Sequence, residues 1–473
     1  MKKKLKRACV LLSVLSLLFV SACAPGAKSE EVRNDSQKEA AEAGTPESRD
    51  TSKATDALAD GNSDKTPSEA YTPLLENYKA LRDITHYLEE ENDWSSVFRV
   101  NIDMIMLKEG WGNTLYSPLS MNCLLAMIAN GANDDLKEQF STYFGSDVEN
   151  VNHFYKTYIE SLVQSDSISA EMANIFFLKE GNAFNEDFLT VIADAYKAEH
   201  GVFAFDENFI ERANAWCAEK THGLITEMPN MYVQNMDAVA LNALSFQAKW
   251  AAAYSDANVR STTFYLPLEG NTVTVTGLYS VESTYLENDQ AVGFMKAYAP
   301  DKNGLSRYAF VGILPKVTDG DRVQSSVDTY YPADADDPFN FDLSRIDLED
   351  LLQSATDEFD VDVMIPEFSM ECSFDLLEAA KQAGLPGLAA DEAFSGIADT
   401  KLSLCQLLQK TRIEVTREGT KAAATSQAGF TGAAMPAEKQ RREVFLNRPF
   451  AFMIYDLQTQ TVLFLGKVVN PQP

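Results

Sequence analysis

The chain has 473 residues and a formal net charge of −30 at pH 7. It contains no basic stripe that would neutralise phosphates, which argues against nucleic acid as a partner. The same acidity keeps the surface soluble and would steer a basic partner toward it.

The N-terminus is typical of an export signal. Basic residues between Lys2 and Arg7 precede an apolar run, Ala8–Val20, that is too short to span a membrane. The run ends in Val-Ser-Ala-Cys23, which resembles the bacterial lipobox. Residues 1–22 are therefore interpreted as a lipoprotein signal peptide and Cys23 as the lipidation site. The protein is expected on the outer face of a bacterial cell membrane, held only by its lipid. The alternative is an ordinary cleaved signal peptide with an incidental cysteine.

Three further regions follow. Residues 23–70 are polar, acidic and free of aromatic side chains, so they are interpreted as a disordered tether. Residues 71–94 carry apolar side chains at helical spacing and are interpreted as a helical extension. Residues 95–473 are dense in Phe, Tyr, Leu and Val and contain no linker-like break, which predicts one large domain.

Within this domain, short strand-like runs outnumber helical ones. Pro118 fits the first turn of a helix that Ser117 can cap. Asn242 interrupts an apolar strand that Trp250 closes, and a buried amide must be hydrogen-bonded, so Asn242 is expected to be a structural clasp. Other helices are expected at Phe98–Leu107, Phe209–Ala218 and Phe374–Ala383, and strands at Ala173–Leu178, Ala238–Phe246, Thr262–Leu268, Thr272–Thr276, Tyr308–Leu314, Val361–Ile365, Phe450–Tyr455 and Thr461–Val469. Helices first and many strands later indicate the α+β class.

No catalytic or metal motif stands out. The GxSxG elbow, the phosphate-binding glycine loop and HExxH are absent, and none of the four histidines has a ligand-spaced partner. Cys123, Cys217, Cys372 and Cys405 form no CxxC pair and are expected to be buried free thiols, although an exported protein leaves a disulfide open. We therefore expect neither an enzyme nor a cofactor.

Small, uncharged residues make up most of the segment Glu414–Gln427. If it were a strand, small residues would alternate on one face, and the other face would carry Lys421 with Ala423, Thr425 and Gln427. The small face comprises Thr420, Ala422, Ala424, Ser426 and Ala428. Since Ala and Gly are poor strand formers, a flexible loop is the alternative.

Several motifs together resemble the signature of serpins, in the correct order along the chain. They are Asn113…Ser117-Pro118…Ser120, Asn214-Ala-Trp216…Thr221-His-Gly223, Leu241-Asn242…Lys249-Trp250, Pro366-Glu-Phe368, Phe394-Ser-Gly-Ile397, Phe445-Leu-Asn-Arg-Pro449-Phe450 and Gly466…Pro471. The resemblance implies helices packed around a large central mixed sheet, smaller sheets and an exposed reactive-centre loop. It also implies a suicide inhibitor whose cleaved loop inserts into the central sheet while a protease is covalently bound.

The resemblance assigns roles to particular residues. Ser117, Ser120, Asn242 and Gln409 would form the shutter beneath the sheet, and Trp250 would mark the breach. Gln409 stands where many serpins have a histidine, and it is expected to bridge Ser117 and Asn242 by hydrogen bonds. The hinge would comprise Arg417, Glu418, Gly419, Thr420, Lys421, Ala422, Ala423, Ala424 and Thr425. Arg417 departs from the pattern because most inhibitory serpins carry a glutamate there.

The family's loop spacing places the reactive bond at Ala433–Ala434. Alanine before the bond suits elastase-like secreted serine proteases, and Met435 is the alternative site because the segment downstream is longer than usual. Lys439, Arg441 and Arg442 lie too far along for trypsin-like inhibition. A monomer is expected, and the alternative function is a non-inhibitory serpin that acts as a cell-surface binding module.

Overall fold

The computed structural model describes residues 112–228, 236–266, 271–302, 304–316, 346–420 and 439–472. The signal peptide, Cys23, the tether, the helical extension and the expected helix Phe98–Leu107 lie outside these ranges. So do the hinge residues Lys421–Thr425, the proposed bond Ala433–Ala434 and Met435.

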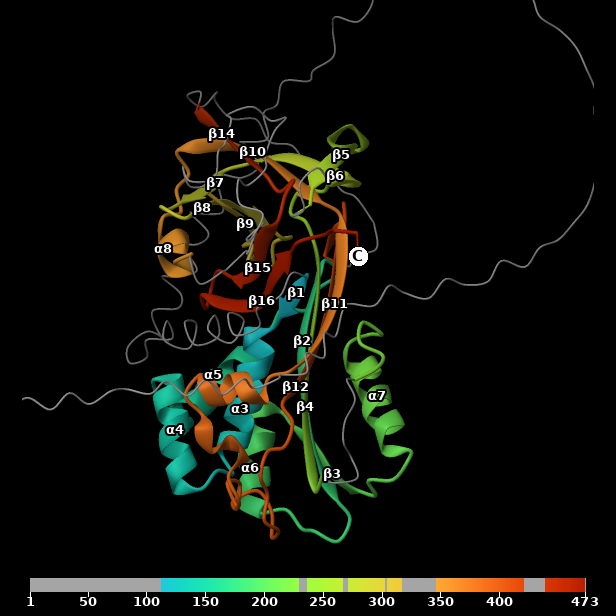
Figure 1. Cartoon of the computed structure of the whole chain (residues 1–473), viewed down its shortest axis with the longest axis vertical. Helices are drawn as coiled ribbons and strands as arrows, with labels where there is room; N and C mark the ends of the chain where they lie inside the picture. The colour runs from blue at the N-terminus through green and yellow to red at the C-terminus, as the bar shows by residue number, and fades with distance from the viewer. Residues whose placement is uncertain are drawn as a thin grey trace, which may run out of the picture.

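A long six-stranded sheet divides the molecule. Figure 1 shows it nearly edge-on, with α7 (Phe209–Lys220) on one face and a group of helices on the other. All its strand pairs are antiparallel except β2 with β3. In spatial order the strands are β11 (Phe368–Asp375), β12 (Leu408–Val415), β13 (Gly419–Thr420), β4 (Ala238–Lys249), β2 (Ile168–Lys179) and β3 (Glu199–Phe203).

The helices opposite α7 form the lower part of Figure 1. They are α3 (Pro118–Ala129), α4 (Asp134–Phe144), α5 (Val148–Ser161), α6 (Glu186–Tyr196) and α9 (Leu377–Gln382). Helix α3 begins where the sequence predicts, since the Ser117 side chain accepts a hydrogen bond from the Ser120 N–H and Pro118 occupies the first turn. Every residue of α3 is buried, so this helix lies in the core beneath the large sheet.

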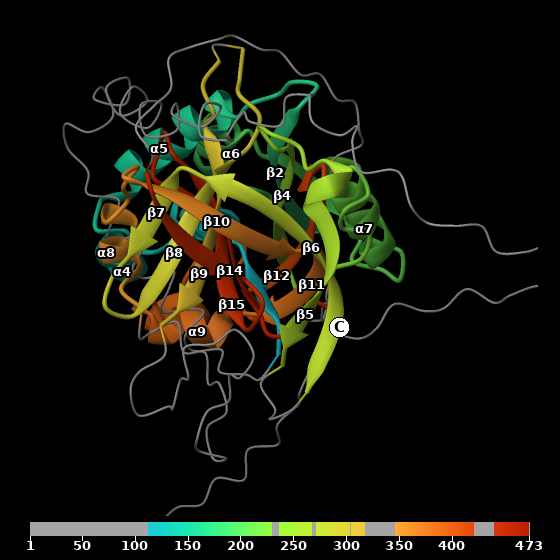
Figure 2. The ribbon, with the colours of Figure 1, turned by 90° about the horizontal axis from the view of Figure 1, so that it is seen from above.

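Two further sheets make up the upper part. Figure 2 shows β5, β6 and β10 crossing the top of the molecule. The four-stranded sheet comprises β14 (Gln440–Phe445), β10 (Phe359–Pro366), β6 (Thr272–Glu282) and β5 (Val259–Tyr265). The second six-stranded sheet comprises β1 (Thr114–Tyr116), β16 (Thr461–Val468), β15 (Phe450–Asp456), β9 (Tyr308–Pro315), β8 (Ala291–Ala297) and β7 (Thr284–Glu287), with α8 (Leu348–Gln353) beside it.

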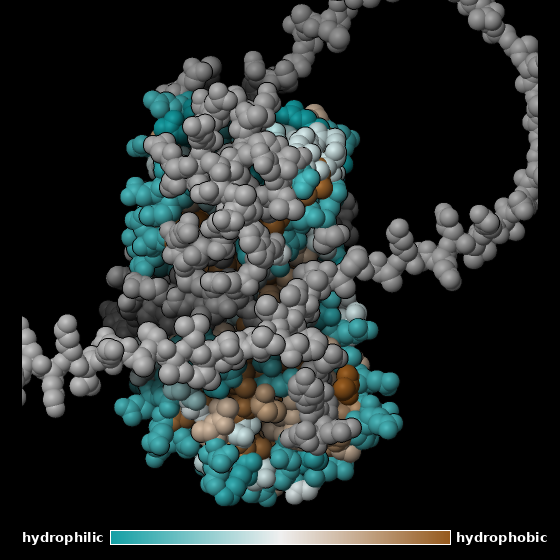
Figure 3. Space-filling model, in the orientation of Figure 1, coloured by the Kyte–Doolittle hydropathy of each residue, from teal (hydrophilic) through white to brown (hydrophobic). Residues whose placement is uncertain are grey.

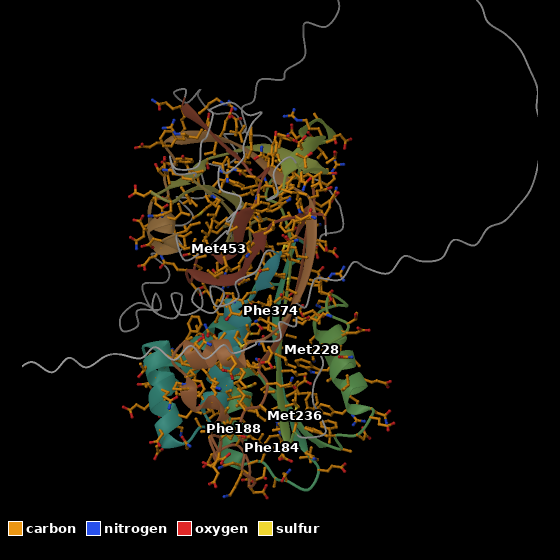
Figure 4. The ribbon with its side chains drawn as sticks, viewed as in Figure 1. Phe184, Phe188, Met228, Met236, Phe374 and Met453 are labelled. Atoms are coloured by element: carbon orange, nitrogen blue, oxygen red, sulfur yellow. The ribbon has the colours of Figure 1, made fainter. Side chains whose placement is uncertain are left out.

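One continuous core joins the two parts. Phe188 in the lower part and Met453 in the upper part are both buried and belong to the same cluster (Figure 4). A second cluster, which includes Trp216 and Cys217, packs α7 against the other face of the large sheet. The α+β class and the expected arrangement of helices around a large mixed sheet are confirmed.

Some expected elements differ in the structure. Phe374 is not helical: it lies in β11, where residues alternate between buried and exposed and pair with β12, and α9 begins only at Leu377. A long strand, β2, lies between α5 and α6, so helices and strands are more interleaved than expected. Strand β5 begins at Val259, before the expected Thr262.

The described surface is mainly hydrophilic on the face shown in Figure 3. Among the described residues, the only large apolar side chains that are exposed are Val202 and Ile210. Within the same ranges, no helix combines the length and the apolar composition that crossing a membrane requires.

Candidate functional site

The candidate site lies where β13 enters the large sheet. Gly419 pairs with Lys249 of β4, and Thr420 pairs with both Ala248 of β4 and Val415 of β12. Over the described residues, β12 and β4 are joined by ladders only through this two-residue strand. The chain therefore already starts a new strand between β12 and β4, at one end of the space that separates them.

Thr420 points into the core, on the face predicted for it. It is 1% exposed, and its hydroxyl lies 2.7 Å from the hydroxyl of Tyr298. Burial raises the pKa of Tyr298, although its hydrogen bond with Thr420 acts in the opposite direction, so the phenol stays protonated at physiological pH. The pair is a neutral hydroxyl contact that fixes the first inward residue of the segment.

Gly419 is required by a close approach of two main chains. Its φ is 150°, and a Cβ built there would lie 2.0 Å from the carbonyl oxygen of Ala248. A side chain at this position would push the segment away from β4.

Trp250, the predicted breach residue, is buried and holds the segment just before β13. Its indole Nε1–H donates to the Thr416 carbonyl at 2.9 Å, and its main-chain N–H donates to the Glu418 carbonyl at 3.0 Å. Its ring stacks on Tyr298 with centroids 4.6 Å apart. Trp250 thus connects β4 to the main chain that leads into the hinge.

Arg417, the residue that departs from the serpin pattern, has acidic partners. Its guanidinium forms an ion pair with Asp256, and its main-chain N–H donates to the Glu367 carboxylate at 2.9 Å. The hydrogen bond with Asp256 raises the pKa of Arg417. The positive charge at the hinge is therefore matched by carboxylates from two other segments of the chain.

The structure brings the four predicted shutter residues together. The Gln409 side chain forms two hydrogen bonds with the main chain of Ser117: Oε1 accepts at 3.0 Å and Nε2 donates at 2.9 Å. The Ser117 hydroxyl donates to the Leu463 carbonyl at 2.7 Å. Gln409 is buried, and it ties β12 to the start of α3.

Asn242 joins this cluster through Ser120 and not through Gln409. The Ser120 hydroxyl donates to Asn242 Oδ1, and Asn242 Nδ2 donates to Asn174 Oδ1 at 2.7 Å. The sequence-based expectation that Gln409 bridges Ser117 and Asn242 is thus wrong in its second half. The first turn of α3 makes the bridge instead, because Ser117 contacts β12 and Ser120 contacts β4.

Asn174 was missed by sequence reasoning. It lies on β2 directly opposite Asn242, is 1% exposed and donates to the Tyr196 carbonyl at 2.8 Å. The signal was present, because Asn174 interrupts an apolar strand as Asn242 does. Its side chain extends the polar network from α3 across two strands of the large sheet.

Strand β14 anchors the chain after residues 421–438, the segment that the sequence predicts to be the reactive loop. It runs parallel to β10, and Arg441 Nε donates to Asp362 of β10 at 2.8 Å. Lys439 donates to the Asp357 carbonyl at 2.6 Å, and the Arg442 guanidinium lies 4.3 Å from the Phe359 ring centroid. The residues on either side of this segment are therefore held in two different sheets, β13 in the long sheet and β14 in the four-stranded sheet.

The described cysteines and histidines form no second site. Cys123, Cys217 and Cys372 are buried and form no disulfide, as expected, but Cys405 is exposed, in a segment outside any helix or strand before β12. His222 pairs with Glu171 at 3.0 Å. Across the described ranges no group of three His, Cys, Asp or Glu residues is placed to hold a metal ion.

Comparison with known proteins identifies the family. A family model described as "serpin (serine protease inhibitor)" matches residues 101–471, which are most of the chain. The chain belongs to the serpin family.

Among solved structures, this serpin resembles the native state of tengpin, a thermophilic serpin, with 29% identity and a TM-score of 0.67 over 81% of this chain and 96% of tengpin. Among curated sequences it is 26% identical to the leukocyte elastase inhibitor of Xenopus tropicalis, over 76% of this chain and 93% of that protein. A serpin-like protein of Thermococcus kodakarensis is also 26% identical, over 76% of this chain. Thyroxine-binding globulin, at 21% identity, shares the fold, with a TM-score of 0.64.

Serpins are generally inhibitors of serine proteases and not catalysts. Thyroxine-binding globulin shows that the same fold also serves ligand binding. Membership of the family therefore does not by itself distinguish a protease inhibitor from a non-inhibitory binding protein, and the geometry of the site has to be considered.

Proposed function

We propose that this serpin is an inhibitor that traps a serine protease covalently and inserts its cleaved reactive-centre loop between β12 and β4. One observation carries the proposal: Gly419–Thr420 already forms the first rungs of a strand between them. The other end of the loop is held in β14. Cleavage between these anchors would free the upstream part to extend the ladder that β13 begins.

The register of β13 predicts which residues would pair as insertion proceeds. Thr420 pairs with Ala248, and each step along the loop moves one residue back along β4. Ser426 would then lie opposite Asn242. On the other side, Val415 pairs with Thr420, so Ser426 would also lie opposite Gln409. Ser426, a small polar residue, would thus lie between the side-chain amides of Asn242 and Gln409. These two residues stand on the strands that the first turn of α3 connects.

The residues before Ser426 suit this path. Ala422 and Ala424 would share the inward face with Thr420, and the charge of Lys421 would fall on the opposite face. Small inward residues pass between two separating strands with little steric hindrance.

We propose elastase-like serine proteases as targets, cut at Ala433–Ala434, with Met435 as the alternative site. The relationship to a leukocyte elastase inhibitor supports this class. Contacts with β10 and the residues around it hold the side chains of Lys439, Arg441 and Arg442. These positions are therefore poor cleavage sites for a trypsin-like enzyme. The proposed location is the outer face of a bacterial membrane, through lipid at Cys23, with the serpin acting as a monomer.

The experiment mixes the purified protein with an elastase and separates the products on a denaturing gel. A covalent complex of the two chains is expected, and cleaved serpin beside fully active elastase would contradict the proposal. Heating provides a second measurement, since insertion should raise the melting temperature of the cleaved form well above that of the intact form.

The second candidate is a non-inhibitory serpin that acts as a surface binding module. Arg417 favours it, because the hinge lacks the glutamate that most inhibitory serpins carry. For this candidate the same gel would show cleavage without a complex, and the melting temperature would not rise on cleavage.

A further inference from the structure

A buried ion pair lies behind the aromatic residues that hold the hinge. Lys296 of β8 and Glu282 of β6 are separated by 2.8 Å, and their side chains are 1% and 0% exposed. The Ser280 hydroxyl donates a second hydrogen bond to Glu282 Oε1 at 2.5 Å. Such a pair is costly to desolvate and is weak grounds for a stabilising role, so its position calls for another explanation.

The Lys296 ammonium also faces two aromatic rings. Its Nζ lies 4.6 Å from the ring centroid of Tyr254 and 5.5 Å from that of Trp250. A desolvated cation at this range is attracted by the ring faces more strongly than an exposed one would be. Because Glu282 fixes the position of Lys296, it also fixes where the two rings lie.

Both rings belong to residues whose main chains hold the hinge. The Trp250 N–H donates to Glu418, and the Tyr254 N–H donates to the Arg417 carbonyl at 3.4 Å. The indole of Trp250 bonds the Thr416 carbonyl. A continuous set of contacts therefore runs from the buried pair to the segment that enters β13.

We propose that the Lys296–Glu282 pair positions the hinge. Lys296 fixes the rings of Trp250 and Tyr254. These two residues hold the hinge main chain where β13 begins, at one end of the space between β12 and β4. Lys296 is a positioning residue, since Trp250 and Tyr254 stand between it and the loop. The part of this inference that concerns inhibition rests on the proposed function, whereas the part that concerns hinge docking does not.

The test replaces the pair without leaving a buried charge. In the full-length protein, Lys296→Met combined with Glu282→Leu removes both charges at similar volume, which commonly leaves stability unchanged or improved. Lys296→Met alone leaves Glu282 buried without its counter-charge and reports the cost of breaking the pair. The matched control is Arg307→Met with Asp456→Leu, a second buried pair with an N–O distance of 2.7 Å, whose arginine also donates to Ser161 and not to the hinge.

Hydrogen exchange provides the readout. The reporters are the main-chain amides of Trp250 and Thr416, which donate to Glu418 and Gly419. In the Lys296/Glu282 double variant we expect these two amides to exchange about tenfold faster. Their hydrogen bonds would lose stabilisation of the size that a buried cation–π contact provides. Amides of the β2–β4 ladder, and both reporters in the control, should keep their rates.

Two results would overturn the inference. One is a double variant in which Trp250 and Thr416 keep their exchange rates. The other is an equal rise throughout the β2–β4 ladder, which would mean a merely structural role. Neither measurement needs a protease, so a failure of the proposed function stays distinguishable: an elastase mixed with the unmodified protein would then give no complex, whatever the exchange rates. If inhibition occurs, the double variant should lose complex and gain cleaved serpin.

Discussion

The hydroxyl of Thr420 meets the hydroxyl of Tyr298 at 2.7 Å inside the core, where the hinge segment enters the large sheet. The contact joins the first inward residue of the loop to a ring that stacks on Trp250. If the loop inserts as proposed, the strand that it would extend is already begun in the intact fold. Changes at Thr420 then separate the steric requirement from the hydrogen bond.

Thr420→Val keeps the shape and removes the hydroxyl. We expect the variant to form the covalent complex with elastase, with hinge docking weakened by about 1 kcal/mol for the lost hydrogen bond. Thr420→Arg places a charge in the same buried position, so we expect elastase to cut it as a substrate, with almost no complex on a denaturing gel. Equal yields of complex from the two variants would contradict a requirement for a small, uncharged residue.

The register of β13 yields a prediction at the shutter. Ser426→Arg would bring a long charged side chain between Asn242 and Gln409, so insertion should stop there and elastase should be released after cleavage. Gln427→Arg is the matched control, because in the inserted strand the neighbouring residue would point to the opposite face. We expect the control to keep most of its complex. Loss of complex in Gln427→Arg, with Ser426→Arg unaffected, would show that the register is shifted by one residue.

Asn242→Ala tests the clasp. The change leaves the Ser120 hydroxyl without its acceptor and removes one of the two donors to Asn174 Oδ1. A buried group left unpaired costs about 1–3 kcal/mol. We expect the free energy of unfolding in urea to fall by that amount. We also expect monomer to be lost sooner on heating, since β4 is then held less firmly to α3. Asn150→Ala on the exposed face of α5 is the control, with a change of about 0.5 kcal/mol or less.

How far the sequence predicted the site depended on the kind of contact. Ser117 and Asn242 were predicted because a helix cap and an amide within an apolar strand leave local signals. The partners of Arg417 could not be predicted, since Asp256 and Glu367 reach it from distant segments and look like ordinary surface acids. The ring contacts of Trp250 were also unpredictable.

The fold followed the same rule. Apolar strands such as β9 and β15 were located to within a residue or two, because a buried strand needs a continuous apolar run. Phe374 was assigned to a helix because its own neighbourhood is helix-friendly, and the ladder between β11 and β12 overrode that preference. Lys296 and Glu282 gave no signal, since charged residues in a strand ordinarily mark its solvent face.

Thiol labelling tests the placement of the four described cysteines. In the folded protein we expect a thiol reagent to modify Cys405, which is exposed, and to leave Cys123, Cys217 and Cys372 unmodified until the protein unfolds. Burial raises the pKa of Cys217 to about 12 and raises that of Cys405 above its ordinary value. Since the thiolate is the reacting form, labelling of Cys405 should be slow at pH 7 and should accelerate as the pH rises past 9.

The same experiment reports on loop insertion. Peptide mass spectrometry after labelling identifies the modified residue, and urea-unfolded protein serves as the control in which all four should react. Cys123 donates to Asn174 within the polar network of α3, β4 and β2, so its protection should persist in the cleaved form if insertion leaves α3 in place. Rapid labelling of Cys123 in the intact protein would mean that β4 and α3 separate without cleavage, and the clasp at Asn242 would then not control the opening of the sheet.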